Sequence, residues 1–432
     1  MIVRIACLTA LGLFGVTTLS AQDITDSRIE ELAAAVEPKV IGWRRDIHAN
    51  PELGNREFRT SALIARHLER LGLEVTTGIA HTGVVGILRG ARPGRVIGLR
   101  ADMDALPVTE QVELPFASNV TTVYNGQEVG VMHACGHDTH VAMLMGVAEV
   151  LASLRGDLAG TVMFIFQPAE EGAPDGEEGG AELMLAEGLF DIARPDAVFA
   201  LHVVSDLPSG AIGFRAGPAL ASADTFEITV NGSQTHGAMP WNGVDPIVTA
   251  AQIVTATQTI ISRQVNISEL PAVVSFGTIS GGVRTNIIPE SVTLSGTIRT
   301  YDLETKSAIH ERLTRTATAI AESAGATADV EISIGYPPTI NDSGLVARTR
   351  ETLDSAFGSG TVLEVPRGTA AEDFSYFANE VPGLMMVLGV RPPDVGPGDA
   401  APNHSPRFFV DEAALVTGVQ ALLTVTTSFL SD

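Results

Sequence analysis

The first half of the chain alternates between helical and strand-like spacing of apolar residues. Between residues 26 and 71 apolar side chains recur every three to four positions, which predicts two amphipathic helices separated by a turn at the Asn50-Pro51 pair. Short, nearly continuous apolar runs follow, as expected of strands buried on both faces of a sheet. The predicted strands are 73–75, 83–88, 95–99, 160–166 and 197–201, and an apolar helix covers 141–154. This alternation predicts an open α/β sheet.

The pattern changes near Ala223 and changes back after Gly335. Residues 225–230 alternate like a half-exposed strand. The segments that follow read as helix, strand, strand, helix and strand at 246–261, 272–279, 292–300, 305–324 and 328–334. The resulting β-α-β-β-α-β order is the split βαβ unit of a ferredoxin-like domain. A helix at 344–357, a strand at 383–388 and a helix at 412–429 then resume the α/β pattern.

A smaller domain is therefore inserted into an α/β domain. We expect the α/β domain to comprise residues 22–220 and 336–432, and the inserted domain to comprise residues 221–335. Residues 1–21 are set apart because they have the features of a secretory signal peptide. Arg4 precedes an apolar run at 5–19, and small residues precede a cleavage site after Ala21.

The apolar run at 5–19 is shorter than a membrane-spanning helix needs to be, although an uncleaved N-terminal anchor is the alternative. We expect a secreted or periplasmic protein with no membrane association after cleavage. Its mature chain keeps Cys135 but not Cys7.

Composition and charge exclude several classes of function. The chain has 27 Lys and Arg against 51 Asp and Glu, a formal charge of −24, which disfavours nucleic acid as a partner. Hydrophobic residues make up 45% of the chain, which argues against disorder. Two cysteines exclude both a disulfide scaffold and a zinc ribbon.

Polar residues with metal-binding chemistry lie at the ends of the predicted strands or in loops, where α/β sheets place ligands. They are Asp102, Asp104, Cys135, His137, Glu170, Glu171, His202 and His404. Cys135 and His137 are separated by one glycine, and thiolate and imidazole together suit zinc and other late first-row divalent ions. His202 and His404, taken singly, are either further ligands or hydrogen-bonded structural histidines.

The adjacent carboxylates Glu170 and Glu171 follow a buried strand and repel each other, so they call for a cationic counter-charge. One glutamate can ligate an ion while the other takes a proton from a water whose pKa the ion lowers. The alternative is a solvated acidic loop. Asp102 and Asp104 can orient a ligating imidazole, or else cap the next turn.

A cysteine nucleophile is a rival interpretation, with His137 as the base of Cys135. It is disfavoured because the glycine-separated pair is cramped and the glutamate pair would have no role. In the inserted domain, His236, Asn286 and Arg299 could together hold a substrate carboxylate and a developing oxyanion. Each of the three can equally be structural.

Together these motifs resemble a known family. The sequence is similar to the co-catalytic metal amidohydrolases that include hippurate hydrolase, N-acyl-amino-acid amidohydrolases and auxin-conjugate hydrolases, which are relatives of aminoacylase and the carboxypeptidase G enzymes. The resemblance runs from about His48 to Glu412. The motifs that carry it are HANPELGNRE, LRADMDALPV, HACGHDTHVAML, FQPAEEGAPDGEEGG, LHV, TNIIPE, GTIRT, AEDFSYF and NHSPRF.

The resemblance implies a two-domain metallopeptidase fold, with a mixed-sheet catalytic domain covered by helices on both faces and a ferredoxin-like lid that also dimerises. It implies two divalent ions per subunit, Mn²⁺ or Zn²⁺ with Co²⁺ or Ni²⁺ as options. The implied ligands are Cys135, His137, Glu171, His202 and His404, with Glu170 as the general base. His236 matches the lid histidine, often supplied across a dimer interface, and Asn286 and Arg299 match substrate-binding residues. The family's Pro-His pair is Pro240-Trp241 here, a departure on the substrate side of the lid.

We therefore expect a metal-dependent amidohydrolase that cleaves small N-acyl amino acids to a carboxylate and a free amino acid, working as a homodimer. A dipeptidase or carboxypeptidase with the same metal core is the first alternative. A non-catalytic binding protein that keeps the fold is the second, and the intact set of catalytic residues argues against it.

Overall fold

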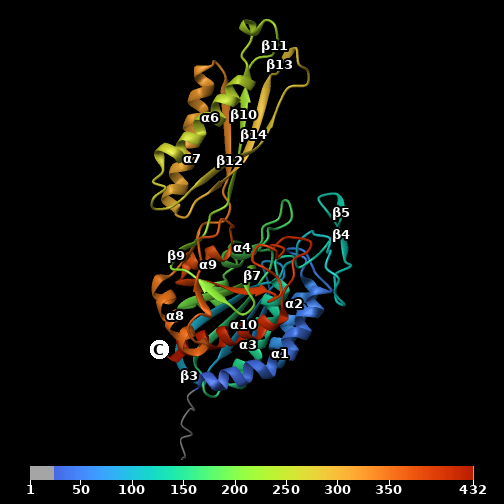
Figure 1. Cartoon of the computed structure of the whole chain (residues 1–432), viewed down its shortest axis with the longest axis vertical. Coiled ribbons are helices and arrows are strands. Elements are labelled where there is room, and N and C mark those ends of the chain that lie inside the picture. The colour runs from blue at the N-terminus through green and yellow to red at the C-terminus, as the bar shows by residue number, and fades with distance from the viewer. Residues whose placement is uncertain (1–23, 432) are drawn as a thin grey trace, which may run out of the picture.

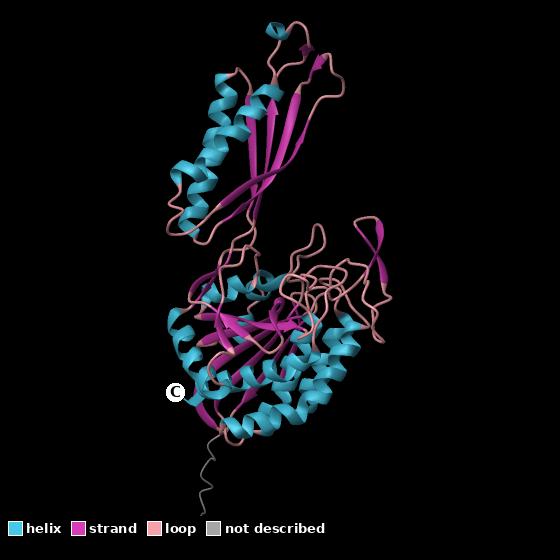
Figure 2. Ribbon diagram, viewed as in Figure 1, coloured by secondary structure: helices cyan, strands magenta, loops and turns pink. Residues whose placement is uncertain are grey.

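The computed structural model describes residues 24–431, so the predicted signal peptide lies outside the described residues. The described chain forms a larger part with an eight-stranded sheet and a smaller part with a four-stranded sheet (Figures 1 and 2). The smaller part, here called the smaller domain, stands beyond one edge of the larger one and is reached by two connecting segments (Figure 1). This agrees with the two-domain α/β fold that the sequence predicts.

The eight-stranded sheet is mixed, and its centre is parallel. The four adjacent strands β6, β3, β7 and β18 run in the same direction. Strands β1, β2 and β8 add antiparallel pairs at the two sides. The order across the sheet is β1 (Glu74–Ile79), β2 (Gly83–Arg89), β6 (Ala159–Gln167), β3 (Arg92–Asp102), β7 (Ala197–Pro208), β18 (Gly383–Arg391), β8 (Ile212–Phe214) and β17 (Val362–Glu364). The parallel centre brings the carboxyl ends of four strands to one edge.

Helices cover both faces of this sheet because its central strands are apolar on both sides. Within β6, Phe164 packs into the core of one face and Ile165 into the core of the other. The first face carries α1 (Asp26–His48), α2 (Phe58–Arg70), α3 (His137–Ser153), α8 (Ser343–Phe357) and α10 (Leu415–Ser431). The second carries α4 (Gly180–Ala186), α5 (Leu189–Ile192) and α9 (Phe374–Glu380).

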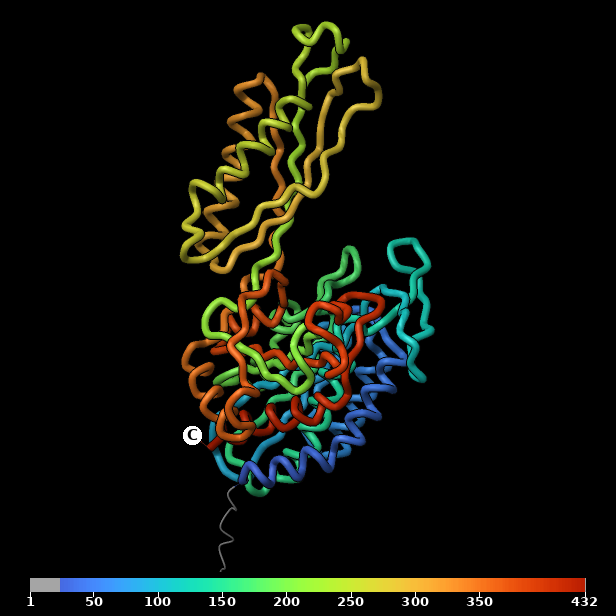
Figure 3. Tube along the Cα trace, in the orientation of Figure 1, coloured from blue at the N-terminus to red at the C-terminus, as the bar shows by residue number. Residues whose placement is uncertain are grey.

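The first and last described helices, α1 and α10, lie side by side although they are far apart in sequence (Figure 3). The segment Glu412–Ser431 is long and apolar enough to cross a membrane by composition alone. In the fold, 72% of its apolar window is buried, and its side chains join the core with α1 and α3. The segment therefore serves as a core helix of the larger domain.

The smaller domain has the predicted β-α-β-β-α-β order. Its sheet is antiparallel, in the order β12 (Val273–Ser280), β14 (Ser291–Arg299), β10 (Asp224–Asn231) and β15 (Thr327–Ser333). Helices α6 (Pro246–Gln264) and α7 (Leu303–Ser323) cover one face. Along β10, buried Phe226 and Ile228 alternate with exposed Thr225 and Glu227, so the opposite face is polar and uncovered. At the far tip, β11 (Thr235–His236) pairs with β13 (Ile287–Ile288).

Three features differ from the sequence-based expectations. Strand β7 continues to Pro208 instead of ending at Leu201, because β18 accompanies it along this extension. A hairpin of β4 (Thr121–Tyr124) and β5 (Gln127–Gly130) projects from the loops beside the sheet edge (Figure 1). The two segments that connect the domains pair as β9 (Gly217–Leu220) and β16 (Thr339–Asn341).

Candidate metal centre

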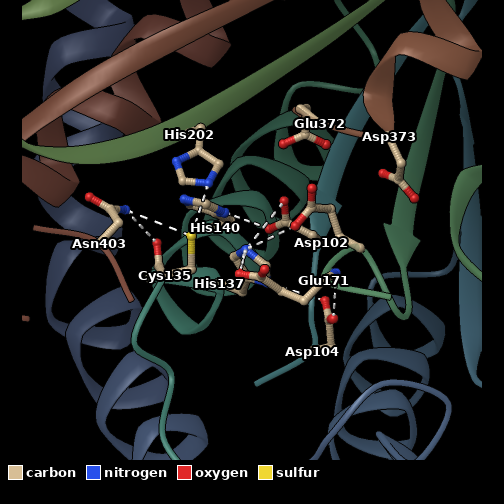
Figure 4. Close-up of polar contacts among 12 residues, drawn as sticks. Asp102, Asp104, Cys135, His137, His140, Glu171, His202, Glu372, Asp373 and Asn403 are labelled. Atoms are coloured by element: carbon tan, nitrogen blue, oxygen red, sulfur yellow. Dashed lines mark hydrogen bonds and ion pairs between the residues drawn. The ribbon is translucent and has the colours of Figure 1, made fainter. Parts of the chain in front are cut away.

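The predicted ligands converge at the carboxyl edge of the parallel strands, and Figure 4 shows Cys135, His137, Glu171 and His202 among them. Cys135 and His137 come from the turn into α3, Glu171 follows β6, His202 lies within β7, and His404 lies in the loop after β18. The turn is tight: Gly136 has φ of +92°, and a Cβ there would lie 2.3 Å from Val203 Cγ2. Glycine is therefore required between Cys135 and His137.

Cys135 lies at the centre of the group. Its Sγ is 3.3 Å from His404 Nε2 and 3.5 Å from His202 Nε2. Glu171 Oε1 is 3.1 Å from His404 Nε2 and 4.0 Å from His137 Nε2. Atoms bound to one zinc ion at about 2.0 to 2.3 Å are themselves roughly 3 to 4 Å apart, so these separations fit ligation.

Two sets of ligand atoms share one carboxylate. Cys135, Glu171 and His404 form one set and His137, Glu170 and Glu171 another, with the ligand atoms of each set within 4.8 Å of one another. Glu171 is common to both sets. Two neighbouring groups that share a ligand suit a pair of divalent ions.

The orientation of the imidazoles also fits ligation. His137 Nδ1 is 3.2 Å from Asp104 Oδ1, while its buried Nε2 has no hydrogen-bond partner among residues 24–431. His202 donates from Nδ1 to its neighbour's carbonyl, Val203 O, at 2.7 Å, which leaves its Nε2 facing Cys135. An orphaned buried nitrogen is unfavourable unless something binds it, so His137 presents a free Nε2 to the centre, while His202 presents an Nε2 in contact with the Cys135 thiol.

Asp104 lies as predicted beside a ligand, and Asp102 lies near the same ring, with Oδ2 3.8 Å from His137 Nε2. Asp102 Oδ1 accepts a hydrogen bond from His140 Nδ1 at 2.5 Å, and His140 Nε2 accepts one from the Val203 N–H at 2.9 Å. Both nitrogens of His140 are thus engaged, so it serves as a support and not as a ligand. Through these two hydrogen bonds, Asp102 holds the backbone next to His202.

Sequence reasoning missed the buried charge network behind the centre. Arg100 lies on β3 and contacts Asp102 Oδ2 at 2.6 Å, Glu372 Oε1 at 2.8 Å and Asp373 Oδ1 at 3.0 Å. Burial by itself lowers the pKa of Arg100, but these three carboxylates raise it well above its usual value. The arginine inside an apolar strand is a signal in the sequence, but two of its acidic partners, Glu372 and Asp373, lie some 270 residues away.

Glu170 is buried at the mouth of β6, with Oε2 3.8 Å from His137 Nε2. Burial, followed by the negative charges of Glu372 and Glu171, raises the pKa of its carboxyl well above the ordinary value. The single positive charge of Arg100 does not balance the negative charges of the carboxylates around it and around Glu170. The centre therefore favours bound cations, as the Glu170-Glu171 pair predicts.

A cavity of about 630 Å³ opens onto these residues, lined by Cys135, Glu170, Glu171, His202, Glu372 and His404 among others. A substrate of small-molecule size fits such a volume. Glu170 and four of the five predicted ligands therefore line one solvent-accessible site, while His137 is fully buried.

The three predicted substrate residues are not at this site within one chain. His236 lies on β11 at the tip of the smaller domain, and its neighbour across the pair is Ile287, next to Asn286 (Figure 1). Arg299 lies at the other end of that domain, at the end of β14 nearest the connecting segments, bonded to Thr297. One chain thus brings His236 and Asn286 together, but apart from both Arg299 and the metal centre.

The fold and site define a metal-dependent hydrolase with a two-domain α/β architecture. The sequence model of peptidase family M20/M25/M40 matches residues 98–428, and the chain belongs to this family. It is a metal-dependent amidohydrolase or peptidase, which confirms the resemblance seen in the sequence.

Among its relatives, thermostable carboxypeptidase 2 of Saccharolobus solfataricus is 41% identical over 388 residues, covering 89% of this chain and 94% of that protein. N-acetyl-L-cysteine deacetylase of Bacillus subtilis is 36% identical over 383 residues, covering 89% and 86%. IAA-amino acid hydrolase ILR1-like 2 of Arabidopsis thaliana is 35% identical over 420 residues, covering 95% and 91%.

A solved structure of the same family supports the two-ion site. The Bacillus subtilis YXEP protein, a dinuclear metal binding peptidase of the M20 family, is 34% identical and superposes with a TM-score of 0.77, covering 92% of this chain and 99% of that one.

Proposed function

We propose that the protein hydrolyses the amide bond of N-acyl amino acids to a carboxylate and a free amino acid. The observation that carries this proposal is the buried Glu170 carboxylate among five converging ligand side chains in an open cavity. Two of the relatives are named for acting on acylated amino acids. The site residues predicted from the sequence therefore have a common task.

In this mechanism Cys135, His137, Glu171, His202 and His404 hold two divalent ions, Mn²⁺, Zn²⁺, Co²⁺ or Ni²⁺. When bound, the ions polarise the scissile carbonyl and lower the pKa of the attacking water. Glu170 takes the proton from that water and can pass it to the leaving nitrogen. Asp104 keeps the His137 ring turned so that Nε2 faces the centre.

The test is release of free amino acid from N-acyl amino acids and from unblocked dipeptides. The mature chain is stripped with chelator and reloaded with each of the four ions. Metal-restored cleavage of the acylated substrates is the expected result. Cleavage of dipeptides alone would move the protein to the peptidase function that the carboxypeptidase relative represents. No turnover with any ion would overturn the proposal.

We further propose a homodimer formed through the smaller domain. Strand β12 is at the edge of its sheet, and Val273 and Ile279 on β12 and Val283 beyond it are exposed. Unpaired strand edges with exposed apolar side chains favour association. A second copy could bring His236 and Asn286 to this chain's metal centre, where the family places the lid histidine.

We also propose that the protein is exported. Residues 1–21 direct the chain to the periplasm or the exterior and are removed after Ala21. N-terminal sequencing of the protein from the native host tests this directly: a mature chain that begins at Gln22 supports it, and a chain that begins at Met1 contradicts it.

A further inference from the structure

A second cavity adjoins the proposed metal site. Its volume is about 360 Å³, and it shares part of its wall with the metal-site cavity, including Val204 on β7 and Met385 and Val387 on β18. The two cavities therefore form one recess. It leads from Glu170 and His202 to β8 and the edge strand β17. A substrate whose amide lies at the metal centre can extend along it.

The wall of the recess is mainly apolar, but two arginines lie in its second part. Arg215 follows β8, and Arg367 follows β17. Arg367 is exposed and makes no hydrogen bond or ion pair within residues 24–431. Arg215 donates from Nη1 to Val365 O at 3.2 Å, while its buried Nε has no acceptor among the same residues.

A tyrosine hydroxyl contacts the same part of the wall through Gly368. The Tyr301 hydroxyl donates to Gly368 O at 2.9 Å, beside the recess. Burial raises the pKa of Tyr301, and the positive charges of Arg367 and Arg215 both oppose that shift. Two cations therefore act on a single hydroxyl at the wall of the recess.

One acidic residue faces the arginines. Asp206 lines both cavities and is exposed, so it belongs to the boundary between the metal site and the recess. Among the residues that line the second cavity, two positive groups against one negative group leave a local excess of positive charge, in a chain whose formal charge is −24. An exposed guanidinium without a partner in the described part of the chain, beside a second guanidinium that is only partly bonded, calls for an anionic ligand group.

We propose that the recess binds a substrate segment made of an apolar chain that ends in a carboxylate, held by Arg215 and Arg367. This rests on the proposed amide hydrolysis and names the substrate class more closely. The segment could come from either half of the substrate. It is a dicarboxylic acyl group or the side chain of a long acidic amino acid.

Two matched substrate pairs separate these sources. N-octanoylglycine and N-(7-carboxyheptanoyl)glycine differ only in the end of the acyl chain. N-acetylnorleucine and N-acetyl-2-aminoadipate differ only in the end of the side chain. In at least one pair, the carboxylate-ended member should have the higher kcat/KM by about tenfold or more, the scale of a charge-assisted contact.

The variant Arg367→Met should reduce that ratio about tenfold, since it removes the contact to the terminal carboxylate. The matched control is Arg66→Met, which removes one exposed positive charge from α2. The control should leave the ratio at its wild-type value. A wild-type ratio of one or below in both pairs, or equal losses in the two variants, would overturn the proposal.

A binding measurement keeps this inference separate from the proposed function. Calorimetry of the metal-loaded Glu170→Ala variant compares suberate with octanoate, which differ only in the second carboxylate. Suberate should bind about tenfold more tightly, and adding Arg367→Met should remove the difference. Equal affinities overturn the inference whether or not any amide is cleaved. Absence of all amide cleavage overturns the proposed function. The inference about the recess is then still decided by the affinities for suberate and octanoate.

Discussion

The hydroxyl of Tyr336 donates a hydrogen bond to the backbone carbonyl of Glu170, with an oxygen–oxygen distance of 2.7 Å. Tyr336 belongs to the segment that returns from the smaller domain after β15. On the other side of the same turn, the Ala169 N–H donates to Glu57 Oε1 at 2.9 Å, and Ala169 has φ of +50°. The backbone that carries Glu170 is thus fixed in an unusual conformation by two hydrogen bonds, one on each side of the turn.

Removing the Tyr336 hydroxyl should slow catalysis without removing metal. Tyr336→Phe keeps the ring that packs against Tyr376 and deletes one hydrogen bond, so we expect kcat to fall about fivefold, the scale of about 1 kcal/mol. Steady-state kinetics and metal analysis of the purified variant check this. Tyr124→Phe, on the projecting hairpin, is the control and should behave as wild type. A loss of metal in Tyr336→Phe would assign the tyrosine to the folding of the centre instead.

Glu170 should be required for turnover and dispensable for metal binding. The variant Glu170→Ala is expected to keep its metal content and to lose at least about two orders of magnitude in kcat, the usual scale for a general base. Metal analysis and kinetics on the same sample provide the measurement. Near-normal activity would remove Glu170 from the mechanism.

Cys135 should be required for metal occupancy because its Sγ contacts two of the other predicted ligands, His202 and His404. Cys135→Ala is expected to lower the number of bound ions per chain and the affinity for those that remain. Atomic absorption after dialysis against limiting metal measures both. An unchanged stoichiometry would refute ligation by this thiol.

The sequence predicts that these residues converge because they follow central strands or lie in turns and loops beside them, and parallel strands place their carboxyl ends at one edge. Cys135 and His137 also sit close in sequence, where spacing alone is informative. The alternating pattern along β10 likewise predicts the smaller sheet and its single covered face.

The supports of the centre could not be predicted in the same way. Arg100 and Glu372 meet across 272 positions, and Tyr336 reaches Glu170 across 166. Such contacts depend on how the sheet and the connecting segments pack, which local pattern does not encode. The extension of β7 beyond Leu201 has the same origin, since it depends on pairing with β18.

His48 should make the stability of the metal-free protein depend on pH. Burial by itself lowers its pKa, but the charge of Asp138 and hydrogen bonds to Asp138 and Glu110 raise it to about 9. The ordinary value is about 6.5, so the folded state favours the protonated ring. This contribution to stability is complete below about pH 6.5 and is lost as the pH rises through about 9.

Urea unfolding of the metal-free protein across this pH range measures the effect. The free energy of unfolding should fall with rising pH in the wild type. In His48→Phe it should be lower at the acidic end and should change less with pH, because the titrating ring is absent. Parallel curves for the two proteins would contradict the assignment.

The position of His236 allows a test of the proposed dimer. His236 is exposed at the tip of the smaller domain, whereas Glu170 is buried in the larger one. If each active site combines Glu170 of one chain with His236 of the other, His236→Ala should be nearly inactive and should keep its metal. Mixed with Glu170→Ala, it should form hybrid dimers in which one of the two sites is intact.

Random exchange of subunits makes about half of the dimers hybrids, so activity should recover to about a quarter of the wild-type value. The control mixes Glu170→Ala with Cys135→Ala, two changes in the same centre, and should give no recovery because no site is intact. Mass spectrometry of tagged chains confirms that hybrids have formed. Hybrids without recovered activity, or wild-type kinetics of His236→Ala alone, would separate His236 from the active site and limit its role to the structure of the tip.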